Sequence, residues 1–190
     1  MKLSHIAGLA AAAALIGCEG PVPSEPSTDG TGASLNRVTA STTGGGQAQL
    51  PPGFSALKLS FTANAKADGS AQGVFSQLYE TASGTVDFAG TVTCVTFDAA
   101  LGRAWIGGVI TRNTSTHPGV QADIHQPGRD VWFRVVDNGE GQDAVDRTTV
   151  FGFEGGGGIA TSADYCAMQL WTANDANTWA VVNGNIQVRP

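Results

Sequence analysis

Apolar and polar residues alternate along short segments in the second part of the chain. In residues 56–62, Leu57, Leu59 and Phe61 fall on one side of an extended segment, which is the period of a half-buried strand. Residues 130–137 repeat this period. The pattern predicts β-strands rather than long amphipathic helices.

Strand-like character recurs at a regular spacing. The segments are residues 56–62, 73–79, 84–97, 103–111, 130–137, 147–153 and 179–188. Asp68 and Gly69 predict a hairpin turn between the first two, and residues 162–171 predict a short helix or a pinned loop. We therefore expect an all-β fold, a single antiparallel β-barrel or β-sandwich of about seven to eight strands. Periodicity does not separate the two architectures.

The start of the chain follows a different pattern. Residues 6–16 form an uncharged apolar run, shorter than the roughly 20 residues that span a bilayer, and fit the core of a secretory signal. The run ends in Leu15-Ile16-Gly17-Cys18, which resembles the lipobox of bacterial lipoproteins. The resemblance implies that residues 1–17 are removed and that Cys18 carries the lipid. An ordinary signal peptide with an incidental cysteine is the alternative.

Residues 18–50 are rich in Gly, Pro, Ser and Thr. Such a segment buries too little apolar surface to offset the entropy of ordering it. It predicts a flexible tether between the lipid and the domain. The expected organisation is a signal peptide (1–17), a tether (18–50) and an all-β domain (51–190).

Three cysteines are present, and lipidation of Cys18 leaves Cys94 and Cys166 as a pair. In an exported protein an even pair predicts a disulfide. Two buried free thiols are the alternative.

The chain is acidic, with a formal net charge of -6. This charge argues against a nucleic-acid partner, which selects basic surfaces. We expect an exported lipoprotein of the cell membrane or outer membrane, held there by its lipid, with the domain in the periplasm or at the cell surface. A glycan or an envelope protein is a possible ligand.

Acidic and amide side chains gather in one predicted turn. They are Asp137, Asn138, Glu140, Asp143 and Asp146. Hard oxygen ligands on a glycine-containing turn suit calcium, although the spacing is not that of an EF-hand. The alternative is that Asp137 and Asn138 bond to the turn backbone and the others face solvent.

Two histidines, His117 and His125, lie in a long polar loop near Asp123. A set of this kind could bind zinc, but zinc needs three or four ligands in a fixed frame. Solvated loop histidines are the simpler interpretation.

Four tryptophans are spread over the domain: Trp105, Trp132, Trp171 and Trp179. Trp132 is predicted to face opposite Val131 and Phe133, so Trp105 and Trp132 are candidates for an outward-facing ligand platform. Packing beneath a loop is the alternative.

Four strings occur in a fixed order. They are Thr91-Val92-Thr93-Cys94-Val95, Ile106-Gly107-Gly108, Phe133-Arg134-Val135-Val136-Asp137-Asn138-Gly139-Glu140-Gly141 and Gly184-Asn185-Ile186-Gln187-Val188. Together they resemble a family of uncharacterised bacterial secreted β-rich proteins over residues 55–188. The resemblance implies the fold and export, and it supplies no catalytic residues. The glycine run 155–158 departs from the family pattern.

Catalytic motifs do not stand out in the sequence. It has no Gly-x-Ser-x-Gly elbow, and the 155–158 glycines lack the lysine and helix of a phosphate-binding loop. The expected function is a non-enzymatic binding or structural role. The alternatives are a hydrolase or isomerase with a pocket inside the β domain, and a calcium-stabilised adhesion module.

Overall fold

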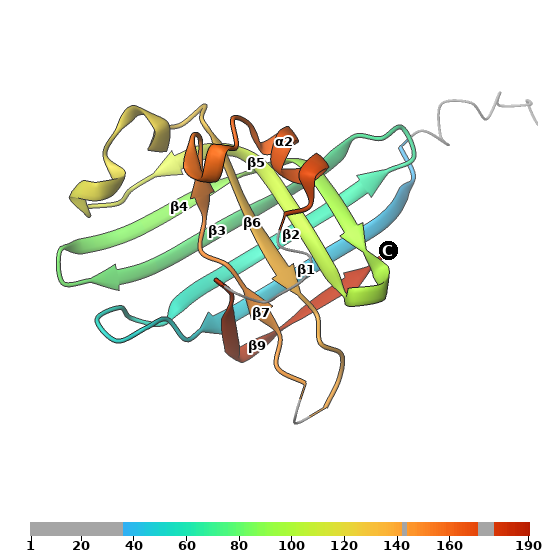
Figure 1. Cartoon of the computed structure of the whole chain (residues 1–190), viewed down its shortest axis with the longest axis horizontal. Helices are drawn as coiled ribbons and strands as arrows, with labels where there is room; N and C mark the ends of the chain where they lie inside the picture. Colours follow the sequence, from blue (N-terminus) through green and yellow to red (C-terminus); the bar gives the residue numbers. More distant parts are fainter. Residues whose placement is uncertain (1–35, 142–143, 171–176) are drawn as a thin grey trace, which may run out of the picture.

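The computed structural model describes residues 36–141, 144–170 and 177–190. The strands are β1 (Val38–Ala48), β2 (Leu57–Lys66), β3 (Ala71–Thr81), β4 (Gly84–Asp98), β5 (Arg103–Asn113), β6 (Asp130–Val136), β7 (Arg147–Thr148), β8 (Gly152–Phe153) and β9 (Trp179–Arg189). They form one sheet in the order β5-β4-β3-β2-β1-β9-β7-β6-β8, and a β5–β6 pairing closes it into a ring (Figure 1). The all-β prediction is confirmed, and ring closure makes the domain a barrel.

One α-helix lies on the outer face of the barrel, against β4, β5 and β6 (Figure 1). This helix, α2 (Ser162–Met168), confirms the short helix predicted around Cys166. A capping box starts it: the Thr161 hydroxyl accepts from the Asp164 backbone N–H, and the Asp164 carboxylate accepts from the Thr161 N–H. In the described part of the chain, no helix has the length and apolar character needed to cross a membrane.

Aromatic side chains fill the barrel interior. The Phe133 ring lies 5.5 Å from Phe61, 5.9 Å from Phe75 and 5.3 Å from Phe151, measured between ring centroids. Phe88 joins this group through Phe151 at 6.3 Å. All five side chains are buried, so the centre of the barrel is a packed core.

The first strand lies where the sequence predicts a tether. β1 occupies Val38–Ala48, inside the predicted 18–50 linker, so the boundary drawn at residue 50 is wrong. Strand β1 lacks the alternating hydrophobic pattern because the residues that face the core are small. A Cβ on Gly44 would lie 2.6 Å from the Phe61 ring and 3.0 Å from Ile186. Here the large side chains come from the neighbouring strands β2 and β9.

The predicted strand 147–153 is interrupted. β7 and β8 both pair with β6. Between them the Thr149 N–H still donates to the Arg134 carbonyl of β6 at 3.0 Å, and residues 150–151 leave the ladder. The buried Gln77 side chain reaches across from β3: its Nε2 donates to the Thr149 carbonyl, and its Oε1 accepts from the Phe151 N–H. A side chain thus replaces backbone pairing at this point.

The two ends of the barrel differ. At the terminal end, Val38 pairs with Lys66 and Arg189 pairs with Ser41, so the described chain begins and finishes there. β1 then runs to the opposite end, which we call the loop end. The 49–56 connection and the 114–129 loop lie at the loop end, away from the C-terminus (Figure 1).

Candidate functional site

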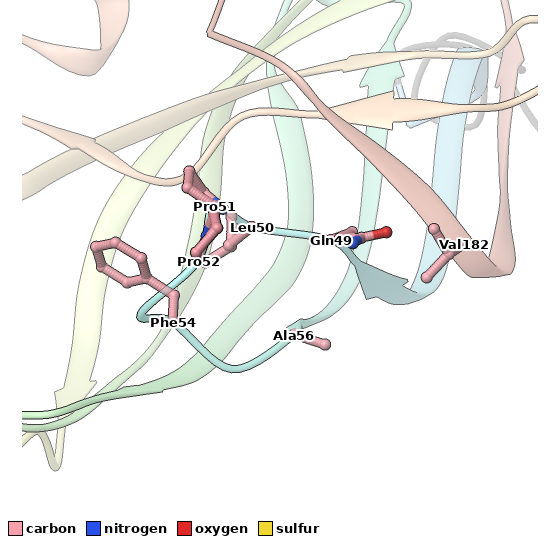
Figure 2. Close-up of a pocket in the computed structure, with 7 residues that line it drawn as sticks. All are labelled: Gln49, Leu50, Pro51, Pro52, Phe54, Ala56 and Val182. Carbon is pink, nitrogen blue, oxygen red and sulfur yellow. The ribbon is translucent and has the colours of Figure 1, made fainter.

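An apolar groove lies at the loop end and consists of two adjoining cavities. The first, of about 410 Å³, is lined by Gln49, Leu50, Pro51, Pro52, Phe54, Ala56 and Val182 (Figure 2). The second, of about 250 Å³, is lined by Leu50, Pro51, Phe54, Tyr79, Val150 and Trp179. Leu50, Pro51 and Phe54 belong to both, so we treat the two cavities as one groove.

The groove is built on the connection between β1 and β2. At one side of this connection the Gln49 N–H donates to the Ala180 carbonyl at 2.9 Å, which ties it to β9. At the other side the Ser55 N–H donates to the Glu80 carbonyl at 2.9 Å, which ties it to β3. Pro51 and Pro52 restrict the backbone between these anchors. The connection is therefore held in one shape without a ligand.

The chemistry of the groove is apolar and neutral. No charged side chain of the described residues lines either cavity. Phe54 remains 47% exposed, and its ring centroid lies 6.1 Å from that of the half-buried Tyr79. Burial raises the pKa of Tyr79, so its hydroxyl stays neutral. The surface suits contact with uncharged, apolar groups.

Trp105 and Trp132 do not form an exposed platform. Trp105 is fully buried, and its indole N–H donates to the Leu170 carbonyl at 2.8 Å. Trp132 is 4% exposed and stacks on Tyr165 of α2, with 5.6 Å between ring centroids. The rings face outward from the barrel, as the alternation predicts, but α2 and the chain after it cover them. Trp171 lies outside the described residues.

Cys94 and Cys166 form the predicted disulfide, with 6.3 Å between their Cα atoms. Cys94 is on β4 and Cys166 is on α2, so the bond fastens the helix to the outer face of the barrel. Cys18 lies outside the described residues.

The acidic turn has a structural role. Asp137 accepts from the Gly139 N–H at 2.8 Å and from the Val188 N–H at 2.9 Å. Asp146 accepts from the Asn138 N–H at 3.1 Å and from the Ile186 N–H at 2.7 Å. The two carboxylates therefore fasten this turn to β9.

Calcium gains no support from this arrangement. Burial raises the pKa of Asp146, and the charges of Asp137 and Glu140 raise it further. Asn138 donates its side-chain amide to the Val145 carbonyl, which is a turn-stabilising bond of the expected kind. Asp143 lies outside the described residues. In residues 36–141, 144–170 and 177–190, no three His, Cys, Asp or Glu side chains gather as a metal-ligand set.

The two loop histidines have separate environments. His117 accepts at Nδ1 from the Gly119 N–H at 3.0 Å. His125 is buried, which corrects the expectation of two solvated histidines, and it packs edge-on against Phe153 at 4.4 Å between ring centroids. They do not converge with Asp123 on a zinc site.

Sequence reasoning missed the groove. Its walls come from the 49–56 connection, the end of β3, residue Val150 and the start of β9, which only the folded barrel brings together. One local signal was present: an aromatic residue, Phe54, directly follows the rigid turn Pro51-Pro52-Gly53.

Comparison with known proteins gives no further guide to this site. No protein-family model, no curated protein and no solved structure matches the chain. The resemblance to a secreted β-rich family stays a prediction.

Proposed function

We propose that this chain is an exported, lipid-anchored protein whose barrel binds a polypeptide partner in the apolar groove at its loop end. Export and anchoring are supported by the apolar run that ends in Leu15-Ile16-Gly17-Cys18 and by a disulfide typical of oxidising compartments. Mass spectrometry of the mature N-terminus should find a diacylglycerol on Cys18. An N-terminus cut elsewhere would contradict the anchor.

The observation that carries the binding role is the exposed groove itself. A rigid connection holds Phe54 half out of the surface beside Tyr79 and Trp179, although the barrel core is filled. Exposed aromatic side chains in a preformed apolar hollow are typical of binding surfaces. Catalysis would need convergent titratable or nucleophilic groups, and the lining contains none that carries a charge.

A polypeptide segment fits the groove better than a sugar or an acyl chain. Sugars require several polar side chains for their hydroxyls, and the lining offers little beyond Gln49 and the polar atoms of Tyr79 and Trp179. An acyl chain favours an enclosed tunnel, and the barrel interior is packed with phenylalanine rings. Two adjoining cavities match an extended segment that places two apolar side chains on one face.

We also expect the groove to lie on the side of the barrel away from the membrane. The described chain starts at the terminal end, and the residues before it lead to the proposed anchor at Cys18. An anchored barrel can therefore direct its loop end away from the lipid surface. The proposed partner lies on that side.

A peptide selection tests this proposal. The whole chain, purified in detergent, is immobilised and used to select from a random dodecapeptide library displayed on phage. We expect a consensus with two apolar residues two positions apart, as on one face of an extended segment. Phe54→Ser should weaken binding of the selected peptides at least about tenfold, because it removes the exposed ring shared by both cavities.

Leu101→Ser is the matched control, since Leu101 is 48% exposed on the turn between β4 and β5. This control should bind the peptides unchanged. Failure to enrich any consensus, or equal binding to Phe54→Ser, would overturn the proposal. Binding of chitooligosaccharide or phosphatidylcholine vesicles that depends on Phe54 would also overturn it, in favour of a glycan or a lipid.

A further inference from the structure

His125 occupies an apolar site at the loop end of the barrel. It is 9% exposed, and its ring packs against Phe153 at 4.4 Å and faces Phe88 at 6.4 Å between centroids. Phe88 belongs to the barrel core. The Nδ1 atom of His125 is buried and has no hydrogen-bond partner. The His125 ring is therefore held here mainly by packing against two aromatic rings.

The 114–129 loop that carries His125 is fastened to the barrel at both ends. At its start the Thr116 N–H donates to the Thr85 carbonyl at 2.9 Å, and near its end the Gly128 N–H donates to the Ile110 carbonyl at 2.8 Å. Asn113, at the end of β5, donates its amide to the Val120 carbonyl at 3.0 Å and to the His125 carbonyl at 2.9 Å. At the start of the loop, His117 accepts the Gly119 N–H at Nδ1.

We propose that the 114–129 loop is a pH-responsive cover, which closes over the barrel when His125 is neutral and opens when His125 takes up a proton. Opening removes the ring from Phe88 and Phe153 and exposes apolar surface at the same end of the barrel as the groove. Acid thereby enlarges the apolar surface available there.

The direction of this pH response follows from the burial of the His125 ring. Burial lowers the pKa of His125 below its ordinary value of 6.5. In the open loop the ring is solvated and titrates near that ordinary value. As the pH falls below about 6.5, His125 becomes protonated in the open loop but stays neutral in the closed loop. The ratio of open to closed loop therefore rises by up to about tenfold per pH unit. The rise ends at the lowered pKa.

Charged groups near the site are already paired or point elsewhere. On β4, Asp87 bonds to Arg112 of β5 at 2.9 Å. After β8, Glu154 lies 3.5 Å from Arg129 and accepts the Asp130 N–H. Asp123 is exposed on the loop itself. None of these charges counts among the causes of the His125 shift, which is due to burial.

Hydrogen exchange tests the cover directly on the whole chain. The Gln126 N–H bonds to the Asp123 carbonyl and the Gly128 N–H to the Ile110 carbonyl, so both amides report loop opening. After correction for intrinsic exchange, we expect their open fraction to rise severalfold, and at most about eightfold, between pH 7 and pH 5.5. Amides of β2 should show no such rise.

His125→Phe is the control, because it keeps an aromatic ring that cannot titrate. The pH dependence of Gln126 and Gly128 should disappear in this variant. An unchanged pH dependence would overturn the proposal.

An NMR titration of the His125 ring in the unmodified chain decides the question even if the variant fails to fold. A midpoint below 6.5, together with acid-dependent opening of the loop, supports the cover. A midpoint at or above 6.5 overturns it.

Discussion

Gln77 shows how one side chain can hold strand β3 to a segment, residues 149–151, that belongs to no strand. Its amide sits inside the barrel, 1% exposed, and satisfies the Thr149 carbonyl and the Phe151 N–H at 3.1 and 3.0 Å. Without it, the Phe151 N–H would be buried without a partner beside the phenylalanine core, whereas the Thr149 carbonyl would still accept from the Thr148 hydroxyl at 3.1 Å. Burying an unsatisfied polar group costs about 1–3 kcal/mol.

Gln77→Leu should therefore lower the free energy of unfolding by about 1–3 kcal/mol, because the buried Phe151 N–H loses its partner. Urea unfolding followed by circular dichroism measures the change. Gln72→Leu is the matched control on the same strand, where the side chain is exposed, and it should change stability by no more than about 0.5 kcal/mol. Equal effects of the two variants would contradict a bridging role for Gln77.

Some glycines have structural roles that the local sequence does not reveal. Gly107 looks like a weak point in a strand, yet β5 runs unbroken through it. A Cβ there would lie 2.6 Å from Cys94 Sγ and 2.8 Å from the Ser162 carbonyl. The glycine therefore lets α2 approach the barrel closely. Such a role depends on a neighbour about 55 positions along the chain and leaves no local pattern.

At the scale of elements, α2 buries part of the outer face of the barrel. It covers Trp105 and Trp132, and the Cys94–Cys166 disulfide fastens it there. A helix of 7 residues is too short to be stable alone. Its position therefore depends on the disulfide and on packing against the tryptophans.

Removing this disulfide should have two measurable effects. Cys94→Ala with Cys166→Ala should lower stability by about 4 kcal/mol in the chain-entropy model for a loop of 72 residues. Loosening of α2 should also increase quenching of tryptophan fluorescence by acrylamide under native conditions. Cys18→Ala, which leaves the pair intact, is the control and should change neither property. Unchanged stability and quenching in the double variant would contradict the fastening role.

Periodicity predicted most of the strands, and their outcomes show why it worked. β2 buries alternate side chains from Leu57 to Ala63, which is the pattern expected of residues 56–62. β1 was missed because its inward positions are glycine and threonine, and β9 and β2 supply the apolar atoms there. A pattern of apolar residues identifies the strands that contribute bulk to the core and overlooks those that make room for it.

At the scale of the whole molecule, the two ends of the closed barrel carry different features. The described chain begins and ends at the terminal end, whereas the groove and the His125 loop share the loop end. The groove could not be predicted from the sequence, because it combines Phe54, Tyr79 and Trp179 from separate strands and connections. The tryptophans that the sequence singled out, Trp105 and Trp132, lie under α2 instead.

Site-specific photocrosslinking in intact cells tests the central claim most directly. A benzophenone amino acid replaces Phe54 in the groove or, as the control, the exposed Asp68 in the β2–β3 turn at the terminal end. The account predicts a discrete protein adduct from position 54, mapped by mass spectrometry to an apolar segment of the partner, and no such adduct from position 68. No adduct from position 54, a lipid adduct there, or the same protein adduct from both positions would contradict it.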